Sequence, residues 1–553
     1  MTGSPEIQVQ TLNHLGIIAG IIDEMGLVEE INQQLGQHER EIVSAGHIVK
    51  AMILNGLGFV TAPLYLFEQF FEGKATEHLI GEGVLSKHLN DDRLGRVLDQ
   101  LYLTGLTKLF VSIALKVAVK EGVCVESLHL DSSSFHVHGE YLSNSEELSV
   151  VVDKGKGDLS QPQTEPKPIH ITYGYSRDNR PDLKQFIIDL ICSADGDIPL
   201  YLRVADGNES DKAMFAQLIQ EFRQQLSLEP LIVADSALYS EDNIQSLGSL
   251  KWICRVPLTV APAKQIVKEL TISDLIDTQL PGYKIACRNS QYGGIAQRWV
   301  IVESQARKQA DIKQLYRTIE QLEKRLNQQM SQLSHQNFRC EADARLAAER
   351  FAKKLKYHVL EGVTVTQQKQ HTQPGRPRKD SQPIVTYRLA GSLVRNPTAI
   401  QETIASSGRF ILATNVINPQ DLSDFQVLLE YKQQQAPERG FRFLKDPLFF
   451  TSSVCLKSPE RVAAMAMVMG LCLLVYSLGQ RQLRQALVAT KESLKDQLGK
   501  ATQSPTLRWI FQCFQDLHLF QVAGVKHIAN LTPERRWILR FFGRRVRQYY
   551  LLC

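Results

Sequence analysis

The sequence contains little that would anchor the chain in a membrane or cross-link it. Its nine cysteines are scattered and odd in number, without a Cys-x-x-Cys pair, which argues against structural zinc and disulfides and favours a reducing cytoplasm. The longest apolar run, Val462 to Tyr476, has 15 residues, fewer than a membrane-spanning helix needs. No signal peptide opens the chain, so we expect a cytoplasmic protein with no membrane partner.

The chain also has little excess charge. Its formal net charge is +4 over 553 residues, so any surface for nucleic acid must be local. Hydrophobic residues make up 43% of the sequence, enough for the cores of three or four domains.

Two aspartates follow apolar runs that are typical of β-strands. Asp131 ends a short alternating run that begins at Ser127, and Asp235 ends a continuous apolar run that begins at Pro230. Acids at strand ends can converge on a common edge of a sheet. Alternatively, each aspartate only caps the turn or helix that follows it.

A third acid, Glu438, lies in a segment with helical spacing. Tyr431 precedes it by seven residues and Lys445 follows it by seven, nearly two helical turns, so the three side chains share one face. A hydroxyl, a carboxylate and an amine in register suit a surface that holds a metal ion beside a phosphate backbone. The alternative is an ordinary solvated helix face.

Three carboxylates brought together would repel one another unless cations lie between them. Oxygen ligands favour Mg²⁺ or Mn²⁺, and two such ions about 4 Å apart can activate the attacking oxygen and stabilise the leaving one. If Asp131, Asp235 and Glu438 converge, the sequence therefore indicates metal-dependent cutting and joining of nucleic acid.

The spacing of Tyr431, Gln434, Glu438 and Lys445 resembles a signature of bacterial insertion-sequence DDE transposases: Tyr, two residues, Arg, three residues, Glu, six residues, Lys. The departure is Gln434, where that family usually has Arg, so a phosphate contact expected there loses its charge. Nearby basic residues could supply it: Lys432, Arg439 and Arg442.

The resemblance implies roles for these residues. Asp131, Asp235 and Glu438 would be the catalytic acids and would bind two Mg²⁺ or Mn²⁺ ions, while Tyr431 and Lys445 would hold the DNA backbone. The implied activity is cleavage at transposon ends, in which activated water nicks the end, followed by attack of the freed 3′-hydroxyl on target DNA.

Further segments resemble the same family. Residues 174–185 with the apolar run that follows them, and residues 198–211, look like the second and third strands of a ribonuclease H-like core, and Ser458–Arg461 opens a long apolar helix. The resemblance covers most of residues 85–553. It implies a multidomain α/β protein whose ribonuclease H-like mixed sheet is interrupted by an insertion and preceded by a helical domain.

We expect five regions along the chain. The N-terminal one has helical periodicity from Leu12 to Leu35, from about Ser44, and after a cap at Asn90, and either binds DNA or serves packing and dimerisation. The expected regions are an N-terminal helical domain (1–120), the first half of the core (121–255), an insertion (256–405), the second half of the core (406–490) and a basic C-terminal helical region (491–553).

The insertion is expected because about 200 residues separate Asp235 from Glu438, far more than one crossover requires. Within an arm at 306–357, apolar residues keep the 3-4 spacing of a coiled-coil seam with a lapse at Gln329. The arm either meets a second protomer or DNA, or forms a self-contained hairpin. Strands at 297–302 and 384–389 indicate a β-rich base. The seam residues are Ile312, Leu315, Ile319, Leu322, Leu326 and Leu333.

Two basic segments are candidates for DNA contacts. Arg376 and Arg378 lie in a proline-containing loop that suits a narrow minor groove, although an ordinary exposed turn explains them as well. Arg544 and Arg545 belong to an arginine-rich C-terminal stretch interleaved with aromatic residues, which either binds phosphates or is a solvated helix face docked through its rings.

These patterns lead to one expected function and two alternatives. We expect a DNA transposase that acts on double-stranded DNA, namely the terminal inverted repeats of its element and a target, as a homodimer without a nucleotide cofactor, in a bacterial cytoplasm and at the nucleoid when bound. A phosphatase with an aspartyl nucleophile would want a second Asp two residues after Asp131, where Ser133 stands. A catalytically impaired, transposase-derived DNA-binding protein is the other alternative, because of Gln434.

Overall fold

The computed structural model describes most of the chain, and everything below concerns these residues alone. They are 8–36, 41–59, 66–139, 141, 166–176, 178–209, 211–223, 229–370, 384–446, 456–522 and 524–552. They belong to two compact units. The first combines Met1–Cys254, Tyr292–Ile295 and Leu429–Cys553, and the second combines Arg255–Gln291 and Ala296–Leu428.

The first unit contains the core sheet. Its strands lie in the order β4-β3-β2-β5-β6. The first three are antiparallel, whereas β5 and β6 run parallel to β2, which is the strand order of a ribonuclease H-like fold. The strands are β2 (Ser127–Val137), β3 (Lys184–Ser193), β4 (Pro199–Ala205), β5 (Leu231–Ala234) and β6 (Trp252–Val256), and two helices connect the later ones, α8 (Asp211–Arg223) and α9 (Glu241–Leu247).

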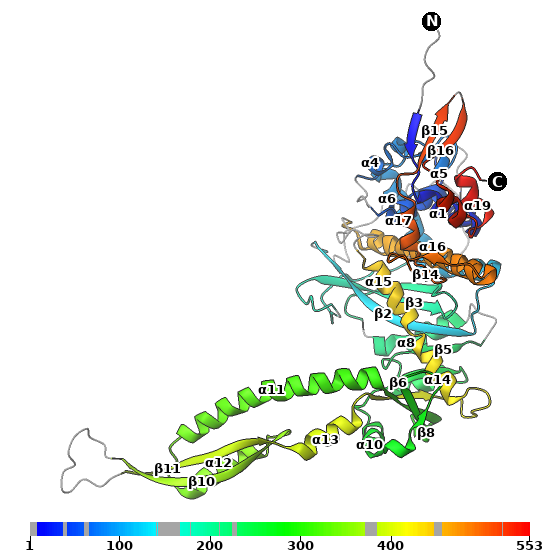
Figure 1. Ribbon diagram of the computed structural model, residues 1–553. Coiled ribbons are helices and arrows are strands. Elements are labelled where there is room, and N and C mark those ends of the chain that lie inside the picture. Colours follow the sequence, from blue (N-terminus) through cyan, green and yellow to red (C-terminus); the bar gives the residue numbers. More distant parts are fainter. Residues whose placement is uncertain are drawn as a thin grey trace, which may run out of the picture. The chain divides into compact units, whose positions relative to one another are not determined.

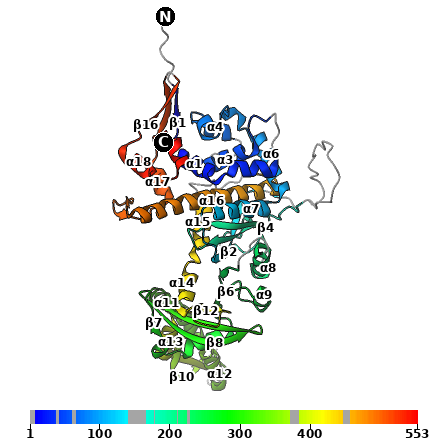
Figure 2. The same cartoon turned by 90° about the vertical axis from the view of Figure 1, so that its right-hand side faces the viewer.

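The long helix α16 (Pro459–Thr490) lies between this sheet and the N-terminal helices (Figure 2). Ser458 caps it by accepting a hydrogen bond from the backbone N–H of Arg461, as the sequence predicts. Part of α16 is long and apolar enough to cross a membrane, but 94% of that window is buried inside the protein, as in the core helix of a globular fold.

A layer of helices packs on the side of α16 that faces away from the sheet (Figure 2). The caps expected at Ser44 and Asn90 are present, whereas the helix expected from Leu12 to Leu35 is divided at Gly26, whose φ is +73°. The helices are α1 (Leu15–Met25), α2 (Leu27–Leu35), α3 (Ala45–Gly56), α4 (Phe67–Phe71), α5 (Thr76–Leu79), the 3₁₀ turn η2 (Ser86–His88) and α6 (Asp91–Thr104). The next helix, α7 (Leu106–Lys120), packs on β4 of the sheet.

The C-terminal region joins the N-terminal helices in the same unit. Strand β1 (Gln8–Thr11) pairs with β15, which pairs with β16 (Figure 1). Helix α19 packs on α1 so closely that a Cβ on Gly20 would lie 2.4 Å from Cα of Val546. The C-terminal region therefore contains strands as well as helices, whereas the sequence had indicated helices only. Its elements are β13 (Leu494–Lys495), β14 (Ala501–Thr502), α17 (Leu507–Cys513), β15 (His518–Val522), β16 (Val525–Ala529), α18 (Pro533–Leu539) and α19 (Arg544–Tyr549).

The second unit has a β-rich base, as expected. Its strands lie in the order β12-β9-β8-β7. Because β12 pairs with β9, the unit continues to Leu428, beyond the boundary expected at residue 405. The base comprises α10 (Ala261–Glu269), the 3₁₀ turn η3 (Ile272–Asp274), β7 (Ile276–Asp277), β8 (Tyr283–Tyr292), β9 (Ile295–Ser304), α13 (Pro397–Ser406), β12 (Arg409–Thr414) and the start of α14 (Asp424–Lys432).

The arm of the second unit is covered by its own elements (Figure 1). The seam of α11 (Gln305–His335) packs on α12 (Glu341–Ala352) and on the hairpin of β10 (His358–Gln370) and β11 (Ile384–Arg395). Leu326 is buried together with Ala348 of α12 and Leu389 of β11. The seam thus packs on a β-hairpin as well as on a helix of the same chain, which favours the self-contained alternative over an arm whose seam meets a second protomer or DNA.

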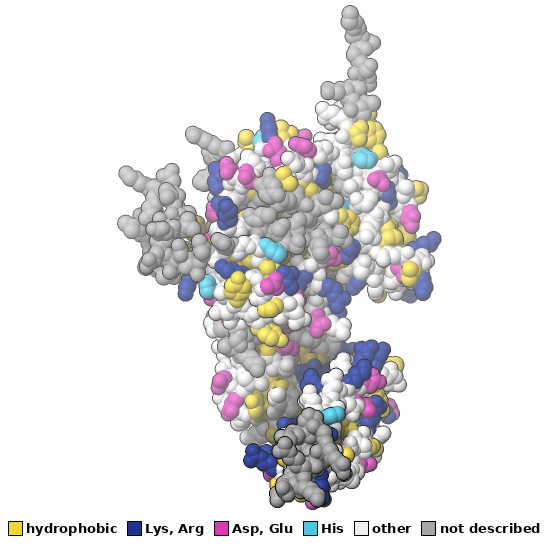
Figure 3. All heavy atoms as spheres, turned by 90° about the vertical axis from the view of Figure 1, so that its left-hand side faces the viewer, with side chains coloured by type: hydrophobic (Ala, Val, Ile, Leu, Met, Phe, Trp, Pro, Cys, Tyr) yellow, Lys and Arg dark blue, Asp and Glu magenta, His cyan; other side chains and the backbone are white. Residues whose placement is uncertain are grey.

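The charged side chains are mixed on the surface. Figure 3 shows Lys and Arg interspersed with Asp and Glu over the face that it presents. This pattern agrees with the low net charge. A DNA-binding surface would therefore consist of a local group of basic residues.

Candidate active site

The strand register brings the two predicted aspartates together. In the parallel pair β2–β5, Leu130 is opposite Ala234, so Asp131 and Asp235 are the next residues on adjacent strands. Adjacent strands lie about 4.8 Å apart, and residues at the same level of a parallel pair point to the same face. Both side chains are half-buried. Asp131 accepts a hydrogen bond from the backbone N–H of Ser132, and Asp235 accepts one from Ala237, both at 2.8 Å.

Asp131 does not end its strand, which corrects the expectation from the sequence. Strand β2 continues to Val137, paired with β3, while its pairing with β5 stops at Leu130. The hydroxyl residues after Asp131 lie within the strand because they pair with β3, and Ser132 also donates a hydrogen bond to the buried Asp189 of that strand. Asp131 therefore lies where β2 loses its parallel neighbour.

Helix α15 (Gln435–Leu444) covers the sheet face that carries Asp131. Leu190 is opposite Asp131 on β3, and its side chain lies 3.5 Å from the position that a Cβ on Gly440 would take. Phe441 packs on Phe135 of β2 at 6.4 Å between ring centroids. The third predicted acid, Glu438, is in the first turn of α15 and is exposed.

The donor chemistry suits a hard divalent cation, but the third ligand is not gathered with the other two. Asp131, Asp235 and Glu438 would offer only oxygen, the preference of Mg²⁺ and Mn²⁺. Among the residues that the structure describes, no three His, Cys, Asp or Glu side chains form a group that could hold a metal ion. A three-carboxylate site thus requires the exposed Glu438 side chain to turn toward the aspartates.

Gln434 has a structural role that the sequence did not reveal. Its side chain is 7% exposed and fastens the start of α15 to β2. Its Nε2 donates to the backbone oxygen of Leu130 at 2.7 Å, and its Oε1 lies 3.2 Å from Nδ1 of His129. Because the Gln434 side chain hydrogen-bonds to two residues of β2, it holds the start of α15 next to Asp131.

His129 is the functional neighbour that sequence reasoning missed. It is fully buried two residues before Asp131, on the same face of β2. Burial lowers the pKa of His129 to about 4, so the ring is neutral at pH 7 and donates from Nδ1 to Gln434. The signal in the sequence was a histidine alternating with apolar residues in a buried strand.

We expect Gln434→Leu to lower the free energy of unfolding by about 2 kcal/mol, because it leaves the buried Leu130 oxygen and His129 Nδ1 without partners. The matched control is Gln433→Leu, since Gln433 is the exposed neighbour and its loss should cost less than about 0.5 kcal/mol. Denaturant unfolding of both variants measures the difference. Equal stability of the two variants would contradict the structural role of Gln434.

The predicted phosphate-holding residues occupy different surroundings. Lys445 ends α15 and forms an ion pair with Asp178 at 2.7 Å, with its ammonium 5.3 Å from the centre of the Phe135 ring. Tyr431 is half-buried near the end of α14. Lys445 would have to exchange Asp178 for a phosphate in order to contact DNA.

The predicted arginines divide into four groups. Arg439 forms a two-pronged ion pair with Asp197, at 2.7 and 2.6 Å, which raises the pKa of the guanidinium. Arg442 is exposed and lines a cavity. Arg544 and Arg545 are exposed on α19, whose Val546 is buried against α1, an arrangement compatible with both alternatives. Arg376 and Arg378 lie outside the described residues.

Sequence and structure comparisons relate this site to known proteins. Residues 7–115 match the model of the family Domain of unknown function (DUF4277). No curated protein sequence matches the chain. Among solved structures, the chain is similar to a piggyBac transposase in a synaptic complex with hairpin DNA, with 8% identity, 98% of this chain and 84% of that chain covered, and a TM-score of 0.37. That likeness is too loose to indicate shared detail.

The second family match is decisive. Residues 128–476, well over half of the chain, match the model described as Transposase DDE domain. The matched range begins in β2, includes the second unit and ends within α16, so it contains Asp131, Asp235 and Glu438. The chain therefore belongs to the DDE transposase family.

Proposed function

We propose that this transposase cleaves DNA at the ends of its mobile element and transfers the freed strands into target DNA, using divalent metal. The observation that carries the proposal is the strand register, since Asp131 and Asp235 are adjacent across β2 and β5 on the face that α15 covers. Family membership supports transposition as the process.

The three acids would share one task. Asp131, Asp235 and Glu438 would hold two Mg²⁺ or Mn²⁺ ions, which when bound activate the attacking oxygen and stabilise the leaving one. Hydrogen bonds from the backbone N–H groups of Ser132 and Ala237 orient the carboxylates of Asp131 and Asp235. Glu438 is exposed on α15, and its side chain would turn toward the two aspartates to complete the metal site.

The basic residues on α15 would hold the DNA. Lys445 would grip a phosphate near the scissile bond, with Tyr431 beside the same strand. Gln434 would keep α15 in register over Asp131 without touching DNA, so its lack of charge would be compatible with activity. Joining two transposon ends needs two active sites, and we therefore propose a homodimer on its terminal inverted repeats, acting in a bacterial cytoplasm at the nucleoid.

A plasmid assay tests the proposal. A supercoiled plasmid that carries the element's ends is incubated with protein and increasing Mg²⁺ or Mn²⁺. We expect metal-dependent nicking at the terminal repeats and, with target DNA, joined products. A protein that shifts the DNA on a gel but never cuts it at any metal concentration would instead be the impaired, DNA-binding relative.

A further inference from the structure

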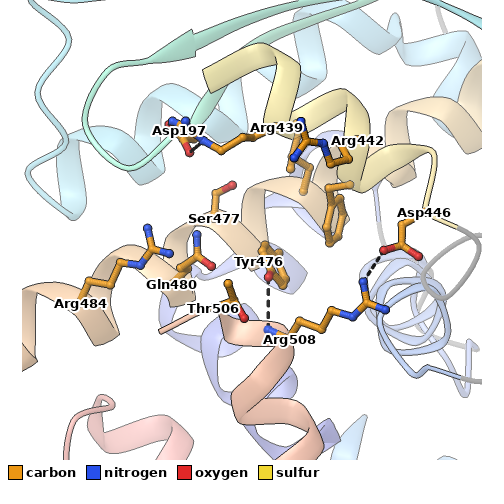
Figure 4. A pocket seen from close by; sticks show the side chains of 13 residues that line it. Asp197, Arg439, Arg442, Asp446, Tyr476, Ser477, Gln480, Arg484, Thr506 and Arg508 are labelled. Atoms are coloured by element: carbon orange, nitrogen blue, oxygen red, sulfur yellow. Dashed lines mark hydrogen bonds and ion pairs between the residues drawn. The ribbon is translucent and has the colours of Figure 1, made fainter. Parts of the chain in front are cut away.

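The first unit contains a cavity of about 250 Å³ beside α15, and Figure 4 shows the side chains that line it. Helices α15, α16 and α17 line it. Its α15 residues include Arg439 and Arg442, which lie one and four positions after Glu438. A helix turns about 100° per residue, so the cavity faces roughly a quarter turn away from the carboxylate. A DNA strand at Glu438 would pass Arg442 within one helical turn.

The lining carries more positive than negative charge. Four arginines face two aspartates in the cavity, and two of the arginines are paired. Arg439 forms an ion pair with Asp197. Arg508 donates to Asp446 at 2.6 Å, and a dashed line in Figure 4 marks this second pair. The surplus charge comes from the other two arginines, Arg442 and Arg484.

Arg442 and Arg484 have no carboxylate partner among the described residues. Arg484 extends from α16, and its Nε donates to the backbone oxygen of Pro505 at 3.0 Å, which fixes the guanidinium while leaving its two terminal nitrogens for other acceptors. Burial lowers the pKa of the Arg484 guanidinium, the nearby carboxylate of Asp197 acts in the opposite direction, and the charge of Arg439 adds to the lowering. A half-buried cation next to other cations is stabilised by an anion between them.

The remaining lining suits a small oxyanion. The hydroxyl groups of Ser477 and Thr506 and the amide of Gln480 belong to the cavity wall. Figure 4 shows Gln480 beside Arg484 and Thr506 beside Arg508. Guanidinium and hydroxyl donors around a common space are the usual recognition groups for phosphate. The volume is below that of a typical site for a drug-sized ligand, which fits one phosphate group better than a whole nucleotide.

We propose that this arginine cavity is a phosphate-binding site, separate from the three carboxylates, that holds one backbone phosphate of the DNA strand lying along α15. The anion preference follows from the cavity alone, whereas the identity of the strand rests on the proposed function. Arg442 and Arg484 supply the charge that attracts the phosphate, and the ion pairs of Arg439 and Arg508 keep the walls of the cavity in place.

The test compares DNA affinity over a range of salt concentrations for wild type, Arg442→Gln, Arg484→Gln and the double variant. Metal is omitted, so that binding is measured without cleavage. We expect each single variant to bind duplex DNA about tenfold more weakly. The slope of log affinity against log salt should become shallower by about 1 when the phosphate contact is lost. Arg442→Lys should retain the wild-type slope, because the charge remains.

The matched control is Arg288→Gln on β8, which removes an exposed arginine outside the cavity and outside the regions expected to contact DNA, and should change neither quantity. Calorimetric titration with inorganic phosphate is the second arm, and we expect binding to wild type that is lost in the double variant. Wild-type DNA affinity and salt slope in the double variant would overturn the proposal. If phosphate binding alone were lost, the cavity would be a site for free anions and the DNA assignment would be wrong.

The two proposals fail in different ways. A protein that never nicks the plasmid, yet loses DNA affinity through Arg442 and Arg484, would overturn the proposed cleavage activity and leave the phosphate site standing. A protein that nicks normally while the double variant binds DNA like wild type would do the reverse.

Discussion

Asp131→Asn should reduce metal-dependent nicking of the terminal repeat by at least about 10³-fold, because metal ions supply several kcal/mol of charge stabilisation and about 4 kcal/mol corresponds to that factor. Asparagine retains the oxygen that accepts the Ser132 N–H, so the strand and its fold should persist. Binding to the terminal repeat should remain within about twofold of wild type. Nicking rates and gel shifts on the same protein preparation measure both quantities.

Two further variants and one control complete this prediction. Asp235→Asn and Glu438→Gln should lose nicking to a similar degree, since each removes one carboxylate from the same set. Asp242→Asn changes an exposed aspartate in the first turn of α9, outside the site, and should cut at the wild-type rate. Continued nicking by the Asp131→Asn protein would rule out the proposed three-carboxylate chemistry.

Acid should destabilise the first unit through His14, in the pH range between its ordinary pKa and its pKa in the fold. His14 is buried at the start of α1, with Nε2 donating to the Leu57 oxygen and Nδ1 accepting from Gln515, both at 2.9 Å. Burial lowers the pKa of His14 from 6.5 to about 4. The unfolded chain therefore binds a proton in this range that the folded chain excludes, so the stabilising contribution is complete above pH 6.5 and is lost as the pH falls toward 4.

The lowering of the His14 pKa determines how much stability is lost in acid. Each pKa unit corresponds to about 1.4 kcal/mol, so the contribution of His14 at neutral pH is about 3 kcal/mol. Denaturant unfolding at pH 7 and pH 4.5 measures it, and His14→Gln should flatten the dependence by a comparable amount. His335→Gln removes an exposed histidine on α11 and should leave the dependence unchanged. The same slope in the His14→Gln and wild-type proteins would show that His14 is not the responsible group.

Local signals in the sequence predicted much of the architecture. The caps at Ser44, Asn90 and Ser458 lie where short-range chemistry places them, because the capping side chain and the backbone N–H that donates to it are only three residues apart. The strands of the core were recognisable from apolar runs, and the position of Asp235 after β5 agrees with that reading.

What the sequence could not supply depends on contacts between distant residues. Small hydroxyl residues after Asp131 are typical of a turn, and the pairing of this segment with β3, more than 50 residues later in the chain, keeps them extended. Gln434 looked like a lost phosphate contact because its partners, His129 and Leu130, are about 300 positions earlier. The arginine cavity likewise draws its lining from three helices, so no single segment reveals it.

The C-terminal region packs on the N-terminal one, as the pairing of β1 with β15 illustrates, and this affects how the chain folds during synthesis. The first helix receives Val546 and Tyr550 as packing partners, and the Tyr550 hydroxyl donates to the backbone oxygen of Asn13 at 2.7 Å. A ribosome delivers the earliest helices long before those partners emerge, and contacts of such large sequence separation form late. The surface of α1 that packs against Val546 and Tyr550 must therefore stay uncovered in the nascent chain until synthesis has passed Tyr550.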